Sequence, residues 1–192
     1  MSDLLALFRS SSLDLAAIAR WFDDASQEAR VAGMRSLGKS QQRALFHATA
    51  NAEALTIDYM VPARLGDLTE VIHEGKNSLP LFTQFQKRFA RLPGRPDTLV
   101  GYNHQTMSAF TGPGYYEARV DGRQIAVDYT KLPSQKVASW PPIIPNSARL
   151  GRFVYADMID YLRRVSAHVT IGRAVRHGKE TENYFLLCRQ DS

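Results

Sequence analysis

The 192-residue sequence contains one cysteine and no long apolar run. Cys188 has no second cysteine to pair with, so we expect no internal disulfide bond. No apolar stretch approaches the roughly 20 residues that a membrane-spanning helix needs. The first residues lack the basic start and the long apolar segment of a signal peptide. These features predict a cytoplasmic protein that does not bind membranes.

The sequence also lacks the short motifs of common cofactor and catalytic sites. It has no glycine-rich phosphate loop, no His-Glu-x-x-His and no Gly-x-Ser-x-Gly. None of the five histidines stands beside another at metal-ligand spacing, so we predict no metal site. One axial histidine could still hold a haem, but nothing else in the sequence favours it, and we predict no cofactor. Cys188 lies in an apolar segment, where a thiol is usually inert.

Charge is unevenly distributed along the chain. Residues 1–62 hold six Lys/Arg and seven Asp/Glu, a net of −1, whereas residues 63–192 hold eighteen and twelve, a net of +6. Residues 26–49 have the outline of a helix-turn-helix, but a net-negative helical region matches a phosphate backbone poorly, so nucleic-acid binding is not expected. The densest basic segment is predicted to be a solvated face. It contains Lys87, Arg88, Arg91 and Arg95.

The first third of the chain is typical of short helices. Alanine is frequent there and β-branched residues are scarce, which favours helix. Apolar residues at helical spacing and capping serines predict helices at 13–22, 26–37 and 40–48, with a short turn before Pro62. We assign residues 1–62 to a helical region that packs on the rest of the chain as part of one structural unit.

Residues 63–192 are predicted to form an antiparallel β-barrel or strongly curved sheet. Strands are expected at 69–73, 99–103, 169–175 and 184–188. Gly75 should end the first of them. The spacing of three phenylalanines predicts a helix at 82–89, and an amphipathic pattern predicts another at 154–165, before the last two strands. The fold class is therefore α+β.

A hairpin is the strongest local signal. Asp121-Gly122 separates two alternating runs, as in a two-residue turn. This turn would pair Ala118 with Ile125. One face of the hairpin is then apolar and should be core, and the other face is mostly polar. Across the barrel region, the residues expected in the core are Val127, Leu162, Ile171 and Leu186.

Residues 112–189 contain strand and turn segments in a characteristic order. They are Gly112-Pro113-Gly114, the Asp121-Gly122 turn, 125–129, 161–165, 169–172 and 184–187. In this order they resemble lipocalin-like (calycin-type) barrel proteins, many of which have no assigned activity. The Gly-x-Trp signature of true lipocalins is absent, because both tryptophans lie elsewhere. The resemblance implies a barrel with a cavity and names no ligand.

Polar residues beside the expected strands provide the candidate site. Ligand pockets combine apolar walls with a few polar groups, often at barrel mouths. The predicted ligand-binding residues are Lys76, His104, Tyr115, Arg119 and Asp128. They predict binding of a small, partly apolar molecule that can be anionic, because a buried Arg119 would need an anionic partner.

Two other functions remain open at this point. The same cavity could serve an enzyme, an isomerase or cyclase, with His104 and Asp128 as the candidate catalytic groups for proton transfer. Alternatively, the N-terminal helices could dock a protein partner, in which case an apolar patch should lie exposed on them.

Overall fold

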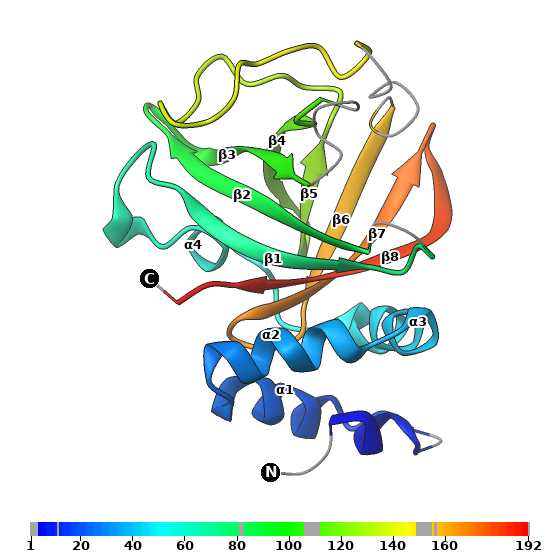
Figure 1. The fold of residues 1–192 in the computed structure, drawn as a ribbon. Coiled ribbons are helices and arrows are strands. Elements are labelled where there is room, and N and C mark those ends of the chain that lie inside the picture. The colour runs from blue at the N-terminus through cyan, green and yellow to red at the C-terminus, as the bar shows by residue number, and fades with distance from the viewer. Residues whose placement is uncertain are drawn as a thin grey trace.

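The computed structural model describes residues 4–10, 12–80, 83–105, 112–148, 155 and 157–191. Its centre is a closed barrel of eight antiparallel strands in chain order, with short helices packed beneath one side (Figure 1). The helical elements are η1 (Leu4–Phe8), α1 (Leu15–Asp24), α2 (Gln27–Ser36), α3 (Lys39–Ala48), η2 (Thr49–Asn51), α4 (Ile57–Met60) and η3 (Ala63–Leu65). The strands are β1 (Val71–Asn77), β2 (Gln84–Leu92), β3 (Arg95–His104), β4 (Tyr115–Asp121), β5 (Gln124–Asp128), β6 (Met158–Arg164), β7 (Val169–Arg176) and β8 (Lys179–Arg189). The predicted α+β class is confirmed.

The three predicted N-terminal helices correspond to α1, α2 and α3. Asp14 caps α1 by accepting a hydrogen bond from the Ala17 N–H, and Ser26 caps α2 in the same way from Ala29. Ser40 was expected to cap the third helix, but α3 already begins at Lys39, with Gly38 at the N-cap.

The helices cover the outer face of β7 and β8 (Figure 1). Ile18, Met34 and Leu45 from the helices share one apolar cluster with Ile171 and Leu186 from the strands. Because successive strand residues alternate between faces, Phe185 and Leu187 of β8 point into the barrel instead. The last strand is thus buried on both faces, which explains its almost continuous apolar sequence. All four residues expected in the core are buried.

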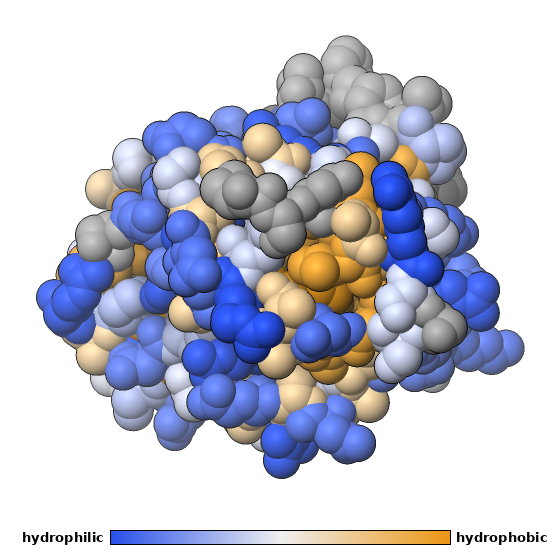
Figure 2. All heavy atoms as spheres, turned by 90° about the horizontal axis from the view of Figure 1, so that it is seen from below, coloured by the Kyte–Doolittle hydropathy of each residue, from blue (hydrophilic) through white to orange (hydrophobic). Residues whose placement is uncertain are grey.

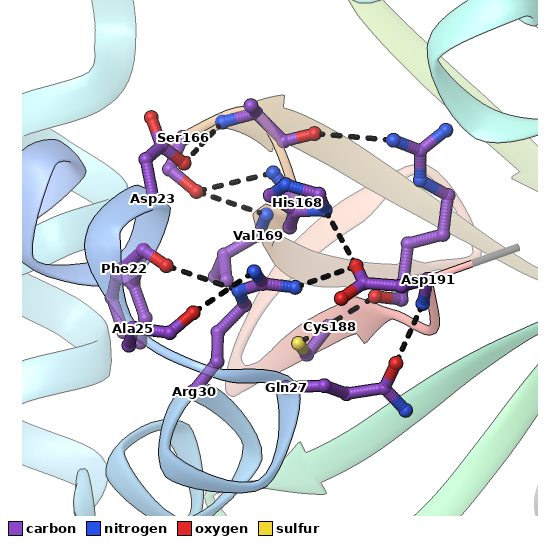
Figure 3. Close-up of polar contacts among 12 residues, drawn as sticks. Phe22, Asp23, Ala25, Gln27, Arg30, Ser166, His168, Val169, Cys188 and Asp191 are labelled. Carbon is purple, nitrogen blue, oxygen red and sulfur yellow. Dashed lines mark hydrogen bonds and ion pairs between the residues drawn. The ribbon is translucent and has the colours of Figure 1, made fainter.

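Hydrogen bonds and an ion pair connect the residues that follow β8 with the helices (Figure 3). Arg30 of α2 is buried and donates to the carbonyl oxygens of Phe22 and Ala25 at 3.0 and 3.1 Å. Its remaining nitrogen lies 2.9 Å from the Asp191 carboxylate. Nearby, burial raises the pKa of the Cys188 thiol to about 11, so the thiol stays protonated near neutral pH.

The two ends of the barrel differ. At one end, the Leu55 N–H donates to the Arg123 carbonyl at 3.1 Å, and Met60 and Val61 join the apolar cluster of the barrel interior. The segment that leads into β1 therefore plugs this end. At the opposite end, where β1 ends and β2 begins, the inward-facing Phe85 and Met158 are only partly buried. We call this end the mouth.

Both helices predicted within the barrel region are wrong. The described part of 82–89 belongs to β2, and the described part of 154–165 belongs largely to β6. A spacing of four residues, as between Phe85 and Phe89, fits a helix turn and also one face of a strand, so it did not discriminate between them. Phe82 and Val154 lie outside the described residues.

The Asp121-Gly122 turn is shifted by one residue. Asp121 pairs with Gln124, and Ala118 pairs with Val127, so Gly122 and Arg123 form the turn. Gly122 has φ of +59°, the backbone that glycine adopts most easily. A shift of the pairing by two residues leaves every side chain on its predicted face. The apolar face is confirmed as core, apart from the exposed Val120 at the turn.

Glycines inside two strands make room for aromatic rings. Gly75 lies within β1 and does not end it, contrary to the prediction. The Phe85 ring lies against Gly75, and the Phe185 ring lies against Gly172 on β7. A side chain at either glycine would occupy the volume of the ring. These glycines therefore mark a close approach of ring to backbone inside the barrel.

We predict that Gly172→Ala destabilises the protein by about 1–3 kcal/mol through overpacking. A β-carbon at this position would lie 2.3 Å from the Phe185 ring. Urea unfolding measures the change. Gly38→Ala at the exposed N-cap of α3 is the reference and should lose at most about 1 kcal/mol, because alanine caps a helix less well than glycine. If Gly172→Ala unfolds at the wild-type urea concentration, the Phe185 ring does not lie on Gly172.

Candidate ligand site in the barrel interior

Strand alternation places the five residues predicted from the sequence on the outer face of the barrel. The inward positions of the same strands are occupied by residues such as His73, Asn103 and Tyr116. The outward residues are Lys76 on β1, His104 on β3, Tyr115 and Arg119 on β4, and Asp128 at the end of β5. A site made of these five residues would therefore not lie in the barrel interior, because the apolar core face of the hairpin is itself the interior.

Tyr115 and Asp128 have structural partners on that outer face. The Tyr115 hydroxyl donates to the carbonyl of Pro141, which lies in the segment between β5 and β6. The Tyr115 ring packs beside Tyr102 and Trp140. This burial raises the pKa of Tyr115. Asp128 accepts hydrogen bonds from the N–H and hydroxyl of Thr130 at 3.0 and 2.6 Å. Arg119 reaches the other carboxylate oxygen at 3.4 Å.

His104 and Asp128 lie in different surroundings. The exposed His104 ring packs edge-on against Tyr102, and partial burial together with Arg88 lowers the pKa of His104. β4 lies between the strands of the two residues, and across it Asp128 is level with Val100, four residues from His104. This register adds about 13 Å along the strand to the two strand spacings between them. This arrangement does not bring the two proposed proton-transfer groups together. Ligand binding by these five residues stays a prediction, and a ligand that they bind would lie on the outer surface of the barrel.

The barrel interior contains a charged residue that the sequence analysis assigned to a solvated face. Lys87 of β2 is 1% exposed. Its ammonium group donates to Asn103 Oδ1 at 3.1 Å, to Asp160 Oδ2 at 2.9 Å and to the Tyr129 hydroxyl. The Asn103 amide also donates to the Tyr129 oxygen at 2.8 Å, and Tyr129 lies 3.2 Å from Asp160. We call these four residues the Lys87 network.

The network is assembled from non-adjacent strands by their register. Lys87 stands directly opposite Asn103 in the β2–β3 pair. Asp160 stands opposite Val127 on β5, two residues before Tyr129. Barrel closure brings the β5–β6 side within reach of β2, so that the four side chains meet in the interior.

Aromatic rings surround the ammonium group. Its nitrogen lies 4.8 Å from the centre of the Tyr129 ring, 5.1 Å from Tyr116, 5.2 Å from Phe185 and 5.9 Å from Phe85. Ring faces attract a cation at such distances, and more strongly where water is excluded. The two phenylalanines lie on the mouth side, which is the side from which a molecule would approach.

A second set of polar groups extends the network toward the mouth. The Tyr155 ring stacks on Tyr129 at 5.2 Å, and the Gln105 amide donates to the Tyr155 hydroxyl at 2.8 Å. Burial raises the pKa of Tyr116 and of Tyr129 well above the usual range. The interior tyrosines therefore remain protonated at neutral pH and can donate hydrogen bonds.

Burial acts on the basic groups in the opposite direction. Desolvation lowers the pKa of Lys87, and the neighbouring Asp160 only partly opposes this effect. Burial also lowers the pKa of His73 to about 3, so its ring is neutral at physiological pH. The His73 Nε2–H donates to the Met60 carbonyl at 2.9 Å. Among the described inward-facing residues, the fully buried charged groups are thus Lys87 and Asp160.

One interior hydroxyl has no hydrogen-bond partner within the described part of the chain. Thr170 of β7 faces inward beside Leu187, and its Oγ1 is buried and unpaired. A buried polar atom left without a partner costs about 1–3 kcal/mol. The interior therefore holds an unused polar group as well as the Lys87 network.

A pattern in the sequence could have revealed the network. Lys87 alternates with Phe85 and Phe89, and Asp160 alternates with Met158 and Leu162. A charge within an apolar run of period two indicates a buried charge on a strand. The helix interpretation of both segments concealed this period.

The helical layer has an apolar patch (Figure 2). Figure 2 shows apolar side chains gathered in the middle of the face that the helices form. Leu5 is 36% exposed, and its neighbours Leu7 and Phe8 are only partly buried. Docking of a protein partner on these helices stays a prediction.

No known protein family and no curated protein matches this sequence. The closed antiparallel barrel agrees with the fold that the lipocalin-like resemblance implied. Among the described residues, no three His, Cys, Asp or Glu side chains are grouped to hold a metal ion. No helix in the same part of the chain is long and apolar enough to span a membrane.

We expect Lys87→Met to destabilise the protein by about 3–5 kcal/mol, because Asp160 would remain buried without a counter-charge. The double variant Lys87→Met/Asp160→Leu should recover most of this loss, since it removes both charges. Urea unfolding of the two single variants and the double variant gives the coupling energy. A loss below about 0.5 kcal/mol in Lys87→Met, typical of surface sites, would contradict the buried ion pair.

Proposed function

We propose that the protein binds a small, neutral and partly apolar molecule in the mouth half of the barrel. The observation that carries the proposal is the Lys87 network, a desolvated ion pair with amide and phenol groups inside a closed barrel. Replacing a buried ion pair by apolar side chains is often neutral or stabilising. Stability alone therefore accounts poorly for Lys87 and Asp160, and recognition of a polar group accounts for them better.

The dimensions of the barrel and the burial along it support this location. The interior of an eight-stranded barrel is either filled by side chains or large enough to hold one small ligand. Burial decreases from Lys87 toward Phe85 and Met158, so the interior is more accessible from the mouth than from the plugged end. An apolar portion of the ligand would contact the two phenylalanine rings, and its polar group would reach Tyr129 and Asn103.

The fully buried charges at the centre of the barrel favour a neutral ligand. Lys87 is already compensated by Asp160, and His73 is neutral. An anionic ligand would bring a second negative charge into a desolvated site, where an uncompensated charge is costly. The sequence allowed an anionic ligand because of Arg119, which lies on the outer face with Asp128.

The test compares 1-hexanol, hexanoate and hexylamine, which share a chain and differ in charge. We expect saturable NMR shifts of the Asn103 side-chain amide with hexanol, and binding of hexanoate that is at least about tenfold weaker, a difference of about 1.4 kcal/mol. Ala174→Phe should abolish hexanol binding, because Ala174 stands opposite Asp160 in the β6–β7 pair. Val175→Phe, opposite Ile159 on the outer face, is the matched control and should bind as the wild type does.

Three results would contradict the proposal. The first is a set of saturable NMR shifts confined to the outer residues around His104 and Tyr115. The second is the absence of any saturable shift with all three probes. The third is an affinity for hexanol that is equal in Ala174→Phe and in the control variant. Tighter binding of hexanoate than of hexanol would overturn the preference for a neutral ligand.

A further inference from the structure

We infer that Lys87 forms a reversible imine with an aldehyde or ketone ligand, and that Asp160 is the counter-ion of the iminium group. This inference rests on the proposed function, because the carbonyl compound must first enter the barrel. It names the ligand class as neutral carbonyl compounds with an apolar chain. The ligand would then be held by a covalent C=N bond to Lys87 in addition to hydrogen bonds.

The amine becomes nucleophilic by a proton transfer within the ion pair. Asp160 Oδ2 lies 2.9 Å from Lys87 Nζ and can accept one ammonium proton. In a medium of low polarity, a neutral amine and carboxylic acid compete with the separated charges, and burial already lowers the pKa of Lys87. The nitrogen lone pair then attacks the carbonyl carbon, forming the C–N bond and leaving the electron pair of the C=O bond on oxygen.

The remaining steps conserve atoms and charge. One proton moves from nitrogen to the new alkoxide through the Tyr129 hydroxyl, giving a neutral carbinolamine. The Asp160 carboxylic acid returns its proton to the hydroxyl, the C–O bond breaks, and water leaves as the nitrogen lone pair forms the C=N bond. The products are water, a protonated imine and the Asp160 carboxylate. The site begins and ends with one cation and one anion, so no further counter-ion is required.

The surrounding groups suit the product as well as the free lysine. The single N–H of the iminium can keep its hydrogen bond to Asp160. Asn103 Oδ1 and the Tyr129 oxygen, which accept from the ammonium in the free protein, become available to the carbinolamine hydroxyl and the departing water. Tyr116 and Phe185 present their rings to the same nitrogen and stabilise the delocalised cation.

Reductive trapping with hexanal and sodium cyanoborohydride at pH 7 tests the inference on the wild-type protein. Peptide mapping by mass spectrometry then gives the labelling rate of each lysine. We expect Lys87 to react at least about tenfold faster than Lys76, because a bound aldehyde is held beside the Lys87 nitrogen. Burial also lowers the pKa of Lys87, which increases the fraction of free amine. Lys76 lies on the outer face of the neighbouring strand and is the internal reference.

The Lys87→Arg variant is the matched control, because it retains the charge without a nucleophilic amine. It should lose the fast adduct while its surface lysines react as in the wild type. If this variant does not fold, the position of the adduct in the wild-type protein still decides the question. Labelling of Lys87 at a rate equal to or below that of Lys76 overturns the inference.

Hexanol binding, measured on the same protein sample, separates this inference from the proposed function. If hexanol shifts the Asn103 amide and Lys87 gives no fast adduct, then the barrel binds neutral molecules and the imine inference is wrong. If hexanol does not bind and Lys87 gives no fast adduct, both are wrong. A fast adduct at Lys87 that 1-hexanol competitively suppresses supports both.

Discussion

The ion pair between Lys87 and Asp160 is the interaction on which the interior of this barrel depends. An ammonium group enclosed by strands is tolerated only if its lost hydration is replaced, and three hydrogen bonds and four aromatic rings replace it here. The strand register is therefore constrained, because a slip of one residue on β2 or β6 would turn one charge outward and leave the other buried and unpaired.

The rest of the fold can be understood as support for that enclosure. Gly75 and Gly172 let two phenylalanine rings lie against the wall of the barrel and beside the ammonium group. The segment that contains Met60 closes one end, and the helices cover β7 and β8 from outside. Water is thus kept from the interior on several sides, while the partly buried Phe85 leaves the mouth as the direction of access.

The sequence predicted the fold class better than the site, for a physical reason. The hairpin faces were predicted correctly because a shift of the pairing by two residues preserves side-chain alternation. The strands β2 and β6 were predicted as helices because the four-residue spacings Phe85–Phe89 and Met158–Leu162 fit a helix turn as well as one face of a strand. Lys87 was predicted on a solvated face because it belongs to the densest basic segment of the chain, and the helix prediction concealed its alternation with Phe85 and Phe89. Long-range strand pairing, which brings Lys87 to Asp160, has no local signature.

The central claim is that Lys87 is a desolvated amine within the barrel, and NMR titration of its side chain tests it most directly. The ¹³Cε resonance of Lys87, assigned by its loss in Lys87→Arg, reports the protonation of the amine as the pH changes. The structure predicts a pKa for Lys87 below the usual lysine value of about 10.4, because burial removes water from its ammonium group. A Lys87 pKa at or above the usual lysine value would contradict the account.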